Sequence, residues 1–298
     1  MPFRSVKRIV VIAAALLPWI AVLPTNTASG SDLAVVKKAG VLRHLGVPYA
    51  NFITGQGDGL DLELMQRFAA SLNLKYRYVE TSWGDVIPDL IGKRFRISDG
   101  RMEKTGDHPI RGDVIANGLT VLEWRQKLIL YSTPTFPTQV WLIAAASSAL
   151  NPIQPTGDTG QDIARVKETV AGKTILGVPD TCLEPSLYGL EKIAKIKYFR
   201  GNLNEVAPAV INGESETAIL DVPDALIALE KWPGKIKVIG PVSPMQSMGV
   251  GFSPSSPELL AAFNRFFERL VRSGEYATMV KFYYPAVFQY FPAFFKVE

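Results

Sequence analysis

Residues 117–132 of the chain, NGLTVLEWRQKLILYS, carry the pattern that decides the fold. The sequence at 113–117 predicts a buried strand, which leads into Gly118 and then into a short helical turn that carries Arg125. Backbone N–H groups exposed at such a turn, with the Thr120 hydroxyl and a planar guanidinium, form a site for an anion. Arginine suits a carboxylate because its guanidinium donates two parallel hydrogen bonds. Arg125 taken alone is more often a solvated surface cation, so the surrounding pattern decides its role.

Short strands and amphipathic helices alternate on both sides of this stretch. We expect strands at 41–47, 75–80, 139–144, 174–178 and 218–221, and helices at 61–73, 83–91, 205–212, 222–231 and 257–271. Such alternation predicts an α/β fold with largely parallel sheets. Residues 94–112 interrupt it, because they are polar and contain the hairpin-turn dipeptide Asp99-Gly100. We expect an inserted surface flap there.

The first 30 residues have the three-part pattern of a secretory signal peptide. Basic residues precede an apolar run at 9–23, and the small residues 28–30 follow it. A membrane anchor is the alternative, but this run is shorter than the roughly 20 residues that span a bilayer, and Pro18 interrupts it. The whole chain has 298 residues, so its length predicts about two domains.

Charge, cysteine and histidine counts exclude several classes of function. The formal net charge is +4, but Arg4, Lys7 and Arg8 carry three of these charges within the predicted leader, so basicity gives no argument for nucleic acid. Cys182 is the single cysteine, and His44 and His108 are the only histidines, so we expect no disulfide, no metal site and no cofactor. The G-x-S-x-G elbow and the P-loop are both absent from the sequence.

From about residue 40 to 285, the chain resembles the bacterial extracellular solute-binding proteins of family 3, the polar-amino-acid receptors of ABC importers. Several short motifs occur in the family's order. They are GLDLEL at 59–64, Trp83 with the I-P-x-L pattern at 87–90, the G-x-T…R…S spacing of Gly118, Thr120, Arg125 and Ser132, VAGK at 170–173, AILD at 218–221 and GVGF at 249–252.

This resemblance implies an α/β, two-lobed type II periplasmic-binding-protein (Venus-flytrap) fold with two crossover hinge segments. After the signal peptide at 1–30, lobe 1 would comprise residues 31–134 and 248–298. Lobe 2 would comprise residues 139–244, with hinge crossings at 135–138 and 245–247. The ligand would bind where strands of both lobes end, and hinge closure would bury it.

The resemblance also implies how a ligand carboxylate is held. Arg125 would clamp it, helped by Thr120 and by the backbone at Gly118. The loop with Thr181 and Cys182 matches the family's G-T-T loop, which closes over the carboxylate. This sequence lacks the glycine and the paired hydroxyls of that loop, so ligand identity stays open.

The rest of the ligand would meet Asp221, which accepts hydrogen bonds from an α-ammonium, and an aromatic wall of Tyr49, Phe52 and Trp83. The residues themselves also allow plainer roles. Asp221 could cap the helix that begins at residue 222, and the three aromatic residues could belong to the core.

The resemblance implies a periplasmic receptor that is a monomer. We expect it to be neither an enzyme nor a nucleic-acid-binding protein. It would bind a small zwitterionic or carboxylate ligand, foremost an amino acid, and deliver it to a membrane ABC permease. One alternative is an enzyme on the same fold, resembling the cyclohexadienyl and arogenate dehydratases, in which Glu184 would protonate a leaving hydroxyl. The other is a module that reports ligand binding to a separate signalling partner.

Overall fold

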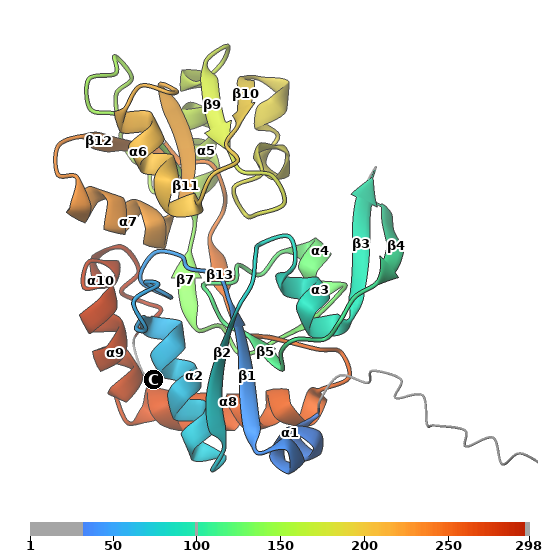
Figure 1. The fold of residues 1–298 in the computed structure, drawn as a ribbon. Helices are drawn as coiled ribbons and strands as arrows, with labels where there is room; N and C mark the ends of the chain where they lie inside the picture. The colour runs from blue at the N-terminus through green and yellow to red at the C-terminus, as the bar shows by residue number, and fades with distance from the viewer. Residues whose placement is uncertain (1–31, 99–100, 296–298) are drawn as a thin grey trace, which may run out of the picture.

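The computed structural model describes residues 32–98 and 101–295, so the predicted signal peptide at 1–30 lies outside the described residues. Two five-stranded sheets, each with its own helices, form two lobes stacked one above the other (Figure 1). None of the helices in the described ranges has the length and apolar character needed to span a membrane.

The sheet of the first lobe has the order β2-β1-β5-β14-β6. Its strands are β2 (Lys75–Glu80), β1 (Val41–Gly46), β5 (Val114–Ile115), β14 (Gly251–Phe252) and β6 (Leu130–Tyr131). Strand β1 is parallel to β2 and β5, whereas β14 is antiparallel to β5 and β6. The helices of this lobe are α1 (Leu33–Ala39), α2 (Leu60–Ser71), α3 (Val86–Ile91), α4 (Glu123–Gln126), α8 (Pro257–Arg272), α9 (Glu275–Tyr283) and α10 (Val287–Tyr290).

The sheet of the second lobe has the order β10-β9-β11-β8-β12. Its strands are β10 (Lys195–Tyr198), β9 (Thr174–Gly177), β11 (Thr217–Asp221), β8 (Val140–Ala145) and β12 (Ile236–Pro241). Its helices are α5 (Thr159–Thr169), α6 (Val206–Ile211) and α7 (Val222–Lys231), with short 3-10 turns η1 (Pro185–Tyr188), η2 (Leu190–Lys192) and η3 (Leu203–Glu205). Strand β9 is parallel to β10 and β11, but β8 is antiparallel to β11 and β12.

The prediction of largely parallel sheets is therefore wrong, because both sheets are mixed. The reason is the path of the chain between the lobes. Strand β8 is the first strand after the chain enters the second lobe, and β14 is the first sheet strand after it returns to the first. Successive strand–helix units give the other strands of each sheet one common direction. Strands β8 and β14 run in the opposite direction, so each is antiparallel to its neighbours.

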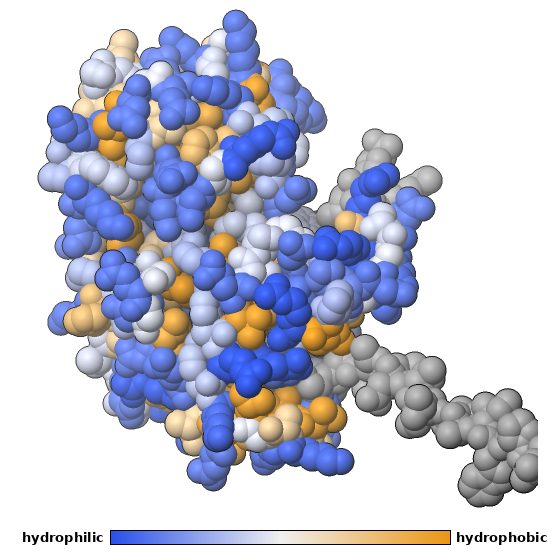
Figure 2. Space-filling view, viewed as in Figure 1, coloured by the Kyte–Doolittle hydropathy of each residue, from blue (hydrophilic) through white to orange (hydrophobic). Residues whose placement is uncertain are grey.

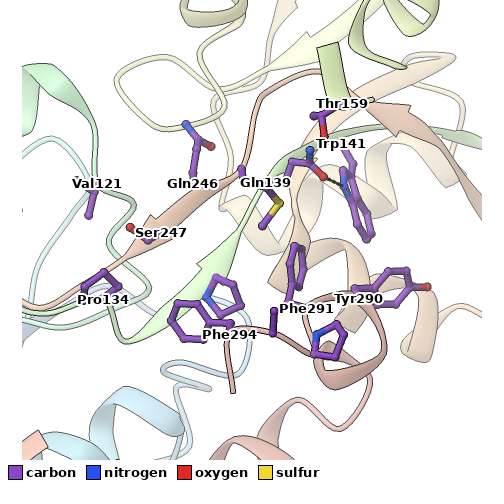
Figure 3. A pocket seen from close by; sticks show the side chains of 14 residues that line it. Val121, Pro134, Gln139, Trp141, Thr159, Gln246, Ser247, Tyr290, Phe291 and Phe294 are labelled. Carbon is purple, nitrogen blue, oxygen red and sulfur yellow. Dashed lines mark hydrogen bonds between the residues drawn. The ribbon is translucent and has the colours of Figure 1, made fainter. Parts of the chain in front are cut away.

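A two-stranded antiparallel ladder of β7 (Phe136–Thr138) and β13 (Gln246–Met248) connects the lobes. These strands overlap the predicted hinge crossings, while the lobe limits themselves stay a prediction. A cavity of about 830 Å³, shown in Figure 3, is lined in part by residues of this ladder. In it, Trp141 of β8 donates a hydrogen bond to Gln139 at 2.9 Å and meets Tyr290 of α10 edge-on at 5.3 Å. The C-terminal segment therefore contacts the second lobe.

The expected flap is an antiparallel hairpin of β3 (Lys93–Ser98) and β4 (Arg101–Asp107). It pairs Ser98 with Arg101, and residues 99 and 100 lie outside the described residues. The hairpin projects from the first lobe beside the second, and Figure 2 shows it as a largely hydrophilic projection. His108 and Arg111 anchor its base by pairing with the buried Asp89 at 2.7 and 2.8 Å.

Candidate functional site

Arg125 lies on the short helix α4 and is almost fully buried, with 2% of its surface exposed. One terminal nitrogen donates to the Thr120 carbonyl at 3.1 Å, and the guanidinium carbon lies 5.1 Å from the Trp124 ring centre. Among the described residues, no group accepts a hydrogen bond from its Nε. A buried donor without an acceptor is costly, so the Nε of Arg125 has the capacity to donate a further hydrogen bond.

Asp221 ends the buried strand β11 in the second lobe and is itself fully buried. Its carboxylate accepts the Asp224 backbone N–H at 3.4 Å, which caps α7, and also accepts the Cys182 thiol at 3.6 Å and the Tyr49 hydroxyl. Burial raises the pKa of Asp221 to about 6, although these hydrogen bonds and the charge of Arg125 oppose the shift. Asp221 is therefore a helix cap whose carboxylate also lies in the field of Arg125.

Hydrogen bonds join the lobes at this place. Tyr49 of the first lobe donates to Asp221 of the second, and the Ala50 backbone N–H donates to the Asn204 side-chain oxygen at 2.8 Å. The structure thus brings together Arg125, Thr120, Cys182, Asp221 and Tyr49, since Cys182 interacts with Thr120, Arg125 and Asp221. A carboxylate, a guanidinium and a phenol from both lobes therefore lie in one buried cluster.

A groove of about 600 Å³ lies along the boundary between the lobes. The first lobe contributes Trp83, Trp124 and the hairpin residues Arg94 and Arg96. The second lobe contributes the loop that follows β9, with Asp180, Thr181 and Glu184. Because Trp83 and Thr181 belong to the predicted site and Trp124 contacts Arg125, we take the groove as the outer part of the candidate site.

Residues 110–286 match the model for the bacterial extracellular solute-binding proteins, family 3. The chain belongs to this family. The arginine-binding protein ArgT of Corynebacterium glutamicum is 24% identical over 222 residues, which are 74% of this chain and 65% of that relative. The alignment therefore spans slightly less than two thirds of the curated relative.

Solved structures share the fold. The P235GK mutant of ArgBP from T. maritima superposes with a TM-score of 0.67 at 19% identity, over 84% of this chain and 97% of that one. AbpA of Streptococcus pneumoniae bound to L-arginine gives 0.65 at 19% identity, over 85% and 98%. The ancestral amino acid-binding protein AncCDT-1, a precursor of cyclohexadienyl dehydratase, gives 0.64 at 20% identity, over 84% and 97%. At these identities the likeness establishes the two-lobed fold alone.

The aromatic residues of the predicted wall in this solute-binding protein differ in their exposure to the groove. Trp83 is half-buried, lines the groove and meets Tyr49 edge-on at 5.6 Å. Phe52 is fully buried, and its ring packs against Phe136 at 5.1 Å and Tyr284 at 5.0 Å. Phe52 therefore takes the core role that the sequence left open, and it supports Tyr49 from behind by stacking at 6.2 Å.

The loop with Thr181 and Cys182 is held by its own side chains. The Thr181 hydroxyl donates to the Val178 carbonyl at 2.9 Å and accepts the Leu183 N–H at 3.0 Å, so it shapes the loop. Burial, with Asp221 nearby, raises the pKa of Cys182 to about 12. Its thiol is therefore protonated at neutral pH and acts as a weak donor to Asp221.

The backbone N–H of Gly118 has a partner that the sequence interpretation missed. It donates to the Asp61 carboxylate at 2.7 Å, so it is not available to a ligand as the resemblance implied. Gly118 has a φ of +65°, and a Cβ there would lie 2.5 Å from the Phe52 ring. The position therefore requires glycine for both conformation and space. Asp61 belongs to the GLDLEL motif at 59–64, but that motif does not indicate which backbone group its carboxylate contacts.

Proposed function

We propose that this protein binds a small zwitterionic or carboxylate ligand, foremost an amino acid, between its lobes and delivers it to a membrane ABC permease from the periplasm. The observation that carries the proposal is the buried guanidinium of Arg125, whose Nε has no partner within the part of the chain that the structure describes, in the same cluster as the Asp221 carboxylate. Arg125 would bind the α-carboxylate through paired hydrogen bonds, and Asp221 would accept the α-ammonium.

Closure of the cleft would couple ligand binding to a change in the relative position of the two lobes. Arg125 belongs to the first lobe and Asp221 to the second, so one ligand can contact both only when the lobes meet. A ligand with this differential affinity shifts the population toward the closed form, which a permease could then recognise. The Tyr49 hydroxyl donates to one oxygen of Asp221, and the ligand ammonium would share or replace that contact.

The ligand side chain would extend into the groove. Its first-lobe wall holds the two indole rings of Trp83 and Trp124, and its second-lobe wall holds the carboxylates of Asp180 and Glu184. Aromatic faces and carboxylates both attract a cationic side chain. Arg96 lies on the opposite rim, while Arg94 is paired with Asp85 at 2.9 Å. These charges, and the arginine-binding relatives, make L-arginine the first ligand to test.

An enzymatic role for Glu184 has less support. Its carboxylate accepts the Tyr198 hydroxyl at 2.9 Å and the Ser186 backbone N–H at 3.4 Å, and it caps η1. A general acid has to present its carboxyl group to the substrate, whereas these contacts give the Glu184 side chain a structural role at the start of η1. We therefore propose binding without catalysis.

A thermal-shift titration tests the proposed ligand class. L-Arginine, L-glutamine and L-glutamate would be compared with agmatine, which is arginine without its carboxylate. Ligand at about 100 times its Kd adds about 2.7 kcal/mol to the free energy of unfolding. For a chain of this size we expect the melting temperature to rise by about 5–10 °C.

At least one of the three amino acids should give this rise, and agmatine should give none. The proposal is contradicted if the three amino acids leave the melting temperature unchanged, or if agmatine stabilises the protein as well as L-arginine does.

A further inference from the structure

The segment 116–120, which we call the ligand loop, rests on two buried polar side chains that do not belong to the proposed ligand contacts. Asp61 lies in the first turn of α2 with 4% of its surface exposed, and its Oδ2 accepts the Gly118 N–H at 2.7 Å. His44 of β1 is fully buried, and its Nε2 lies 2.5 Å from the Ala116 carbonyl oxygen. Both contacts are to loop backbone.

The histidine contact has a defined direction. A carbonyl oxygen only accepts, so Nε2 of His44 must carry the proton that it donates to Ala116. Nδ1 then accepts the Tyr76 hydroxyl at 2.8 Å. Burial lowers the pKa of His44 to about 4, so the ring is neutral at physiological pH and holds this arrangement.

The ligand loop in turn carries the guanidinium of the candidate site. The Thr120 carbonyl accepts Arg125 at 3.1 Å and the Tyr131 hydroxyl at 3.0 Å. Gly118 has a positive φ, and its Cα lies close against the Phe52 ring. The backbone at Gly118 therefore has little space in which to move. A shift of the Gly118 peptide would therefore move Thr120, and Arg125 with it.

We propose that Asp61 is a positioning residue for ligand binding, which holds the ligand loop so that Arg125 meets the ligand carboxylate without rearrangement. The inference rests on the proposed function. A binding site gains affinity when its contacts are already in place, because the cost of ordering them is then absent. Asp61 contacts the ligand loop and acts on the ligand only through it.

The role of Asp61 requires an acceptor oxygen and no charge. Burial, with Asp61 nearby, raises the pKa values of the Tyr76, Tyr276 and Tyr284 phenols, so these three uncharged groups lie around the carboxyl group. Burial raises the pKa of Asp61 itself to about 7. An asparagine amide oxygen can accept the same N–H, so Asp61→Asn should preserve the loop, while Asp61→Ala should release it.

The test compares these two variants with Phe68→Leu, a core substitution on the same helix. Phe68 packs edge-on against Phe263 of α8 at 5.2 Å, so its loss lowers stability through a different contact. The first readout is hydrogen exchange of the Gly118 amide in the absence of ligand. The second is calorimetric titration with L-arginine, L-glutamine and L-glutamate.

Asp61→Ala should speed Gly118 exchange at least about tenfold and weaken binding of whichever of the three amino acids the wild type binds by about tenfold. Asp61→Asn should change either quantity less than about threefold. Phe68→Leu should lower the melting temperature and change neither. The inference would be overturned if the Gly118 amide of Asp61→Ala exchanged at the wild-type rate. It would also be overturned if that variant exchanged faster but bound the amino acid with wild-type affinity. If the wild type binds none of the three, the proposed function fails, and the exchange measurement alone decides whether Asp61 holds the loop.

Discussion

Arg125→Ala should weaken binding of an amino acid ligand by about 30-fold to several thousand-fold, which corresponds to about 2–5 kcal/mol. The guanidinium is buried and its Nε lacks a partner among the described residues, so the variant leaves the ligand carboxylate buried without its counter-charge. Isothermal titration calorimetry with L-arginine, or with whichever amino acid of the panel binds, measures the loss directly.

Two further variants give this experiment its controls. Arg125→Lys keeps the charge but loses the paired donors, and we expect an affinity between those of the wild type and the alanine variant. Lys127→Ala removes an exposed cation two residues further along and should leave binding unchanged. Unchanged affinity in Arg125→Ala would rule out its role as the carboxylate clamp.

Asp221→Asn should weaken binding by about 10- to 100-fold at pH 8, because a charged hydrogen bond to the ligand ammonium becomes a neutral one. The affinity of the wild type should also depend on pH. An ammonium binds the ionised carboxylate, so the affinity of the wild type should fall as the pH drops below about 6, where Asp221 takes up a proton. The limiting slope is about tenfold per pH unit, and the asparagine variant should lack this fall.

Asp224→Asn provides a matched control from the same helix. Asp224 is also buried, and burial together with the charge of Asp221 raises its pKa well above the ordinary value. Its replacement should change affinity little. Asparagine caps helices as well as aspartate does, so Asp221→Asn should fold. If both variants bind equally well at pH 8, the assignment of the ammonium to Asp221 is wrong.

Local patterns in the sequence were sufficient to predict most of the elements. The helix expected at 222–231 coincides with α7, because an aspartate cap, an early proline and apolar spacing all mark it. The flap was predicted from Asp99-Gly100 between polar runs, and the structure has the hairpin of β3 and β4. Strand direction was not predictable in this way, because it depends on where the chain crosses between lobes.

The candidate site was predictable in part, for a related reason. Arg125 and Asp221 lie in motifs whose order and spacing resemble those of the family, so the resemblance made both residues candidates for the site. The contact of Asp61 with Gly118 joins positions 57 residues apart, and no local pattern records which backbone group a buried acid will meet. The same limit applies to Phe52, whose core position depends on Phe136 and Tyr284 from distant parts of the chain.

The most direct test of the account is a crystal structure of the protein with its amino acid ligand bound. The account predicts the α-carboxylate paired with the guanidinium of Arg125 on the first lobe, and the α-ammonium hydrogen-bonded to Asp221 on the second. A ligand bound elsewhere, or one whose carboxylate points away from Arg125, would contradict it.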